Sequence, residues 1–71
     1  MKYIKSVGKY DICEASEEEC KKGYMGMPWE YPCYCVFYNN EDPDERTPRN
    51  VGYSESDFGT LEAAEKWCKQ Y

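Results

Sequence analysis

The chain of 71 residues contains no histidine. Ser-His and Cys-His nucleophile pairs, histidine acid–base catalysis and zinc sites that mix cysteine with histidine all need that side chain, so each is excluded. Phosphate-binding loops are missing as well, because Gly23 and Gly26 fit neither the G-x-x-x-x-G-K-[ST] nor the G-x-G-x-x-G pattern. These absences predict a protein that is not an enzyme and that carries no cofactor.

Aliphatic side chains are scarce, with only two Ile, three Val and one Leu. Eight Tyr, two Trp and two Phe must therefore supply most of the buried surface, at roughly 150–250 Å² for each buried ring. A chain of this length builds at most one hydrophobic core. We expect residues 1–71 to form a single small globular domain.

Long apolar runs and basic clusters are also absent. No segment approaches the roughly 18–20 apolar residues of a membrane span. Lys2, Lys5 and Lys9 have no apolar run between them, so we predict no signal peptide and expect a cytoplasmic location. The net charge of −5, from fourteen acidic and nine basic residues, argues against nucleic acid and membranes as partners.

The first fourteen residues have the alternation of an extended chain, which Gly8 interrupts. Glycine inside a strand often marks a bulge. One long strand with a bulge and two short strands, over residues 2–7 and 9–14, both fit the pattern.

A short helix of about two turns is expected next. Ser16 and Glu19 match a capping box, in which each side chain accepts a hydrogen bond from a backbone N–H at the start of a helix. Gly23 suits the C-terminal cap, and Cys20 is the expected inward residue.

Residues 29–38 alternate with a period of two and are rich in aromatic side chains, which predicts a strand. Pro32 indicates that its first part lies at a sheet edge or precedes the paired region. One face, predicted to be buried, carries Trp29, Tyr31, Cys33, Cys35 and Phe37. The other face, predicted to be exposed, carries Tyr34, Val36 and Tyr38.

The polar residues 39–50 predict a long loop, and residues 51–56 a partner strand for 29–38. Asp57 or Thr60 then caps a helix over residues 61–70. Its apolar stripe consists of Leu61, Ala64, Cys68 and Tyr71. The expected fold is α+β: an antiparallel sheet of three or four strands, with a C-terminal helix and the short helix on one face.

The five cysteines allow three interpretations. A zinc site usually needs C-x₂₋₄-C pairs, whereas the spacings here are C-x6-C and C-x-C. A disulfide framework is disfavoured by the odd number of cysteines. The favoured interpretation is that the free thiols of all five act as small core hydrophobes. They lie at Cys13, Cys20, Cys33, Cys35 and Cys68.

Two surfaces are candidates for binding a partner. The segment 23–29 combines glycine, methionine and aromatic residues, which is typical of adaptable binding surfaces, although it also suits a lid over the end of the sheet. The second is the outward tyrosine set of the strand over 29–38. Together the candidate residues are Tyr24, Met25, Met27, Trp29, Tyr34 and Tyr38.

The function expected from these features is that of a non-catalytic accessory or protein-interaction module, acting as a monomer or weak dimer. The alternative is an acidic inhibitor or DNA mimic, whose acidic clusters at 14–19 and 41–45 occupy a basic cleft of a partner. A third hypothesis is a metal or redox protein built on the cysteines.

The segment YSESDFGTLEAAEKWC resembles the closing unit of many small bacterial α+β proteins, in which a last strand leads through F-x-T-x-E-x-A into a short helix. This resemblance covers residues 51–71 and implies a small bacterial protein of phage or conjugative-element origin. Arm-type DNA-binding domains of phage integrases share the layout of three strands and a helix. The chain departs from them because residues 29–38 and 51–57 contain no Lys or Arg.

Overall fold

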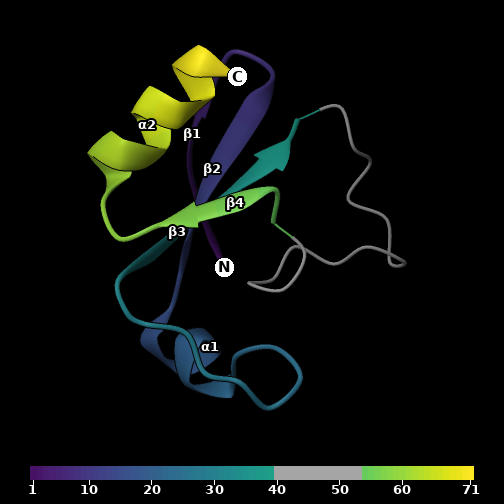
Figure 1. The fold of residues 1–71 in the computed structure, drawn as a ribbon, viewed down its shortest axis with the longest axis vertical. Coiled ribbons are helices and arrows are strands. Elements are labelled where there is room, and N and C mark those ends of the chain that lie inside the picture. The colour runs from purple at the N-terminus through teal and green to yellow at the C-terminus, as the bar shows by residue number, and fades with distance from the viewer. Residues whose placement is uncertain (40–53) are drawn as a thin grey trace.

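The computed structural model describes residues 1–39 and 54–71. Its elements are β1 (Lys2–Val7), β2 (Tyr10–Ala15), α1 (Glu17–Lys22), β3 (Cys33–Tyr38), β4 (Ser56–Phe58) and α2 (Leu61–Gln70), as Figure 1 shows. The strands form a four-stranded antiparallel sheet in the order β1-β2-β3-β4. The prediction of an α+β fold with a C-terminal helix packed on an antiparallel sheet is confirmed. Neither α1 nor α2 is long and apolar enough to cross a membrane.

The N-terminal segment forms two short strands. Val7 pairs with Tyr10, so Gly8 and Lys9 alone connect β1 to β2. Gly8 has a φ of 61°, a value that favours glycine in a tight hairpin turn. The irregularity in the β1–β2 register lies elsewhere, between Tyr3 and Lys5. Gly8 therefore marks the turn between two strands, and the bulged single strand is ruled out.

A reciprocal capping box starts helix α1. Ser16 Oγ accepts a hydrogen bond from the Glu19 N–H at 3.1 Å, and Glu19 Oε1 accepts one from the Ser16 N–H at 2.9 Å. Glu19 Oε2 also lies 3.0 Å from the ammonium group of Met1. Burial raises the pKa of Glu19, but the hydrogen bonds from Ser16 and the N-terminal ammonium outweigh it and lower that pKa below its usual value.

Two strand boundaries differ from those predicted. β3 begins at Cys33, so the prediction of a strand from Trp29 is wrong for residues 29–32. These residues precede the paired region, which is one of the two arrangements that Pro32 indicates. The Trp29 N–H donates to Cys20 O at 2.8 Å, which ties this segment to α1 instead of to the sheet. β4 spans Ser56–Phe58, so the strand predicted over 51–56 is wrong at Ser54 and Glu55 and stops short of Phe58, which pairs with Tyr34. Residues 51–53 lie outside the described residues.

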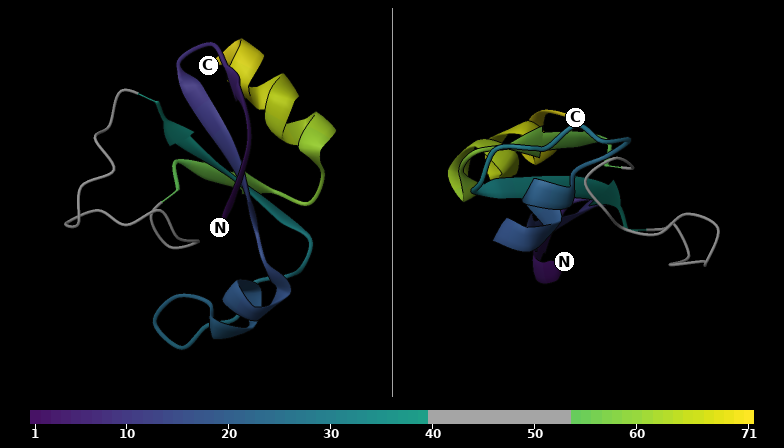
Figure 2. Two further views of the ribbon diagram at one scale, coloured as in Figure 1. Left: turned by 180° about the vertical axis from the view of Figure 1, so that it is seen from behind. Right: turned by 90° about the horizontal axis from the view of Figure 1, so that it is seen from below.

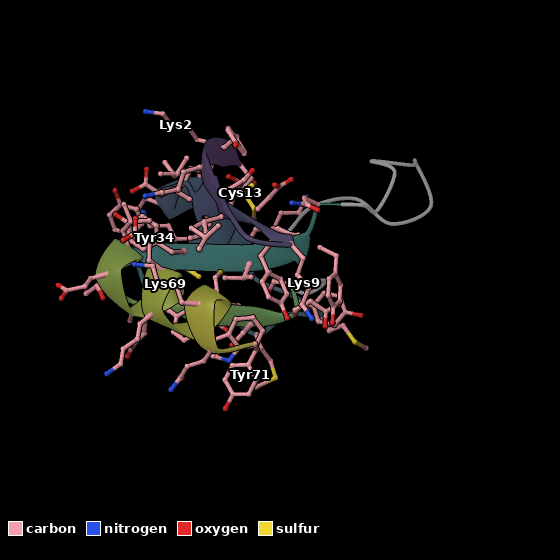
Figure 3. All side chains as sticks on the ribbon, turned by 90° about the horizontal axis from the view of Figure 1, so that it is seen from above. Lys2, Lys9, Cys13, Tyr34, Lys69 and Tyr71 are labelled. Atoms are coloured by element: carbon pink, nitrogen blue, oxygen red, sulfur yellow. The ribbon has the colours of Figure 1, made fainter. Side chains whose placement is uncertain are left out.

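Figure 2 shows α2 along one face of the sheet and α1 at the far end of the strands, where its Cys20 packs with side chains of the opposite face. Figure 3 places Cys13 on one side of the sheet, and Lys69 and Tyr71 of α2 on the other. The cluster on the α1 side consists of Cys13, Ala15, Cys20, Cys33, Cys35 and Phe37. The cluster on the α2 side consists of Tyr10, Ile12, Val36, Ala64 and Cys68. The prediction of both helices on one face is wrong, because β2 and β3 are apolar on both faces and each face needs a cover.

Aromatic rings fill the space under α2. Trp67 lies 5.0 Å from Tyr10 and 6.1 Å from Phe58, between ring centroids, and the Tyr10 ring stacks on Tyr38 at 5.1 Å. Tyr34 and Tyr38 are both half-buried against this cluster. The prediction that these two tyrosines face outward is therefore wrong, because α2 covers their face of β3.

Candidate functional site

The residues between α1 and β3 form a tight turn whose side chains point outward. The Tyr24 N–H donates to Met27 O at 3.1 Å, and the Met27 N–H donates to Tyr24 O at 3.0 Å. The central residues Met25 and Gly26 have φ values of 53° and 80°. A type I′ turn requires positive φ at both central positions and strongly prefers Asn-Gly there. Met25 therefore adopts a backbone conformation that costs roughly 1–2 kcal/mol for a residue with a side chain.

Both ends of this turn are attached to α1. The Gly23 N–H donates to Glu19 O at 2.9 Å, and Gly23 itself has a φ of 64°. At the other end, the Trp29 N–H donates to Cys20 O, and the Trp29 side chain packs against the cysteine-rich cluster. These contacts hold the turn at the end of the molecule away from α2, where Figure 1 shows it projecting beyond the sheet.

The apolar side chains of this region are strongly exposed. Met25 is 84% exposed and Met27 71%, with Tyr24 exposed beside them. Tyr31, which the alternation of 29–38 assigns to the buried face, is 54% exposed. That assignment is wrong because the strand geometry starts only after Pro32, so the alternation does not extend back to Tyr31. We name Tyr24, Met25 and Met27 the turn surface.

The predicted partner residues thus fall into two groups. Tyr24, Met25 and Met27 lie together on the turn, and Trp29 anchors its C-terminal end. Tyr34 and Tyr38 lie under α2 and form no surface with them. Tyr31 is exposed and not buried, and Pro32 is the signal in the sequence that marks this difference, because β3 begins only after it.

All five cysteines are buried and carry free thiols, so the prediction that they act as core residues is confirmed. The Sγ atoms of Cys33 and Cys35 lie 3.7 Å apart, and Cys13 pairs with Cys35 across the β2–β3 ladder. Among residues 1–39 and 54–71, no three His, Cys, Asp or Glu side chains are arranged to hold a metal ion.

Burial raises the pKa of four thiols above the ordinary 9.0: Cys20, Cys33, Cys35 and Cys68. Protonated, desolvated thiols are poor nucleophiles.

These pKa shifts predict how stability depends on pH. At pH 7, well below the ordinary thiol pKa of 9.0, the thiols are protonated in both the folded and the unfolded chain. Above that pH the unfolded chain releases thiol protons while the folded chain retains them, so the free energy of unfolding must fall. Each thiol held protonated contributes a slope of up to about 1.4 kcal/mol per pH unit.

Urea unfolding at intervals from pH 7 to 10.5 measures this slope. Cys68→Ala should reduce the slope by the contribution of one thiol, which provides the matched comparison. A free energy of unfolding that stays constant through pH 10.5 would contradict the burial of these thiols.

Some residues of the acidic cluster at 14–19 make contacts within the fold, and others are exposed. Glu19 caps α1 and pairs with the N-terminus, whereas Glu17 and Glu18 are exposed in the first turn of that helix. The second acidic cluster, at 41–45, lies outside the described residues.

Known proteins give no further guide to the site. Comparisons of the chain with protein-family models, with curated proteins and with solved structures found no match.

Proposed function

We propose that this protein is a non-catalytic interaction module whose partner binds the turn surface. The observation that carries the proposal is the exposure of Met25 and Met27 on a turn that is held in a strained backbone conformation. Large apolar side chains gathered on one surface often mark an interaction site, and methionine adapts well to the shape of a partner.

The shape of the turn indicates what the partner must offer. A projecting turn with two methionines is convex, so its partner needs a concave apolar pocket. Burying one methionine side chain contributes roughly 1.5–3 kcal/mol. A complex of this kind is expected to resist salt, because exposed charges, but not apolar contacts, are screened over about 8–10 Å.

The test uses a variant that removes both methionines but keeps the turn. Met25→Asn places Asn-Gly at the centre of the turn, which is the preferred type I′ pair, and Met27→Gln keeps the length of that side chain. The control variant is Tyr3→Ser with Tyr71→Ser, which removes two exposed rings outside the turn surface. Each tagged protein is used to capture partners from a lysate of the organism that makes it, at 0.1 and 0.5 M NaCl.

We expect the wild type and the control variant to retain the same partner at both salt concentrations. The double methionine variant should fold normally and lose at least about tenfold of the captured partner. Equal capture by the methionine variant would contradict the proposal. Loss of the partner from the wild type at 0.5 M NaCl would support the acidic inhibitor or DNA mimic instead.

A further inference from the structure

A pocket lies between the segment that leads into β3 and the end of β4. Its volume is about 240 Å³. The residues that line it are Trp29, Glu30, Pro32, Cys33, Asp57, Phe58 and Gly59. Asp57 pairs with Cys35 across the β3–β4 ladder, so its side chain lies on the same face of the sheet as the Cys33–Cys35 thiols.

The lining of this pocket combines aromatic rings with negative charge. Trp29 and Phe58 supply the rings, Glu30 and Asp57 supply carboxyl groups, and none of the described lining residues is basic. No ion pair or hydrogen bond links the Asp57 carboxyl to another side chain of residues 1–39 and 54–71. Partial burial raises the pKa of Asp57, and its charge adds to the larger effect of burial in raising the pKa of Cys33. The wall that the described residues form around this pocket is therefore negatively charged.

We propose that this pocket binds an alkylammonium group, either of a free amine or at the end of a lysine side chain. A cation over an aromatic ring gains roughly 0.5–2 kcal/mol, and a nearby carboxylate adds a charge–charge attraction. Anions are repelled here. Calcium prefers six to eight oxygen ligands, more than two carboxyl groups supply. This inference goes beyond the proposed function, because it does not depend on the exposed methionines or on the partner that binds them.

The experiment is a ¹H–¹⁵N NMR titration of the intact chain with choline, and separately with N-acetyl-lysine amide. The signals followed are the indole N–H of Trp29 and the backbone amides of Asp57 and Gly59. Sodium chloride controls for ionic strength. 3,3-Dimethyl-1-butanol, the uncharged analogue of choline, controls for apolar binding alone.

We expect saturable shifts at the pocket with at least one of the two amines. Saturation by choline alone identifies a free quaternary amine as the ligand. Saturation by N-acetyl-lysine amide identifies the ammonium group at the end of a lysine side chain as the ligand. Asp57→Asn should weaken binding at least about fivefold, because it removes one charge without changing the shape. The matched control is Glu62→Gln, an exposed acid of α2 outside the pocket, which should leave the affinity unchanged.

Three results would overturn the proposal. The first is that sodium chloride alone reproduces the NMR signal shifts seen with both amines. The second is equal binding of the uncharged alcohol, and the third is an equal loss of affinity in Asp57→Asn and Glu62→Gln.

Discussion

Replacing Trp67 with alanine should remove about 3 kcal/mol from the free energy of unfolding, at the lower end of the range for large aromatic side chains because Trp67 is only half-buried. Its ring lies 5.0 Å from Tyr10, 6.1 Å from Phe58 and 5.1 Å from Tyr71, between centroids. A chain of this length has a stability of roughly 4–10 kcal/mol, at about 0.05–0.15 kcal/mol per residue. The variant should therefore lose a large part of its stability, because Trp67 supplies much of the apolar contact between α2 and the sheet.

Urea unfolding followed by far-ultraviolet circular dichroism measures this loss. Tyr71→Ala is the matched control: its ring also stacks on Trp67, but it is 64% exposed at the end of α2. We expect the control to cost less than about 1 kcal/mol. Equal losses in the two variants would show that Trp67 does not hold α2 on the sheet.

Replacing Gly23 with alanine should cost at least about 3 kcal/mol, whereas the same change at Gly26 should cost about 1–2 kcal/mol. Both glycines have positive φ, at 64° and 80°. A Cβ atom on Gly23 would lie 1.9 Å from Met27 O and 2.8 Å from Pro28 Cα, so the backbone must move. A Cβ atom on Gly26 would meet nothing within 4 Å, so only the conformational cost applies.

This pair of variants separates a steric clash from the general cost of a side chain at positive φ. Urea unfolding gives the two free energies, and the amide signal of Met27 reports whether the turn has moved. Gly23→Ala should also displace the turn surface and reduce partner capture. If the two variants proved equally stable, the close approach of Gly23 to Met27 would be wrong.

Features that depend on the residues of a single helix or strand could be predicted from the sequence. Thr60 caps α2, accepting a hydrogen bond from the Ala63 N–H at 3.2 Å, and Ala64 and Cys68 of the predicted stripe are its buried residues. The alternation in β3 correctly grouped Cys33, Cys35 and Phe37 on a buried face.

Which helices and strands pack against each other could not be predicted from the sequence. Alternation separates the two faces of a strand but does not tell which face a helix will cover, so Tyr34 and Tyr38 were assigned to solvent. The same rule failed at Tyr31, because the alternation in the sequence begins at Trp29, before the strand itself begins at Cys33. The pocket combines residues from both sides of the 40–53 segment, and no spacing pattern links Asp57 to Trp29.

The measurement that most directly tests the partner surface is oxidation of the methionines in the free and the partner-bound protein. Mild peroxide treatment followed by peptide mass spectrometry gives the rate at which Met25 and Met27 become sulfoxides, and hydroxyl-radical labelling gives the reactivity of Tyr3 and Tyr71. If the turn surface is the contact, the partner will protect both methionines and leave the two tyrosines unchanged. Unchanged oxidation of Met25 and Met27 in the complex would contradict the proposed interaction site.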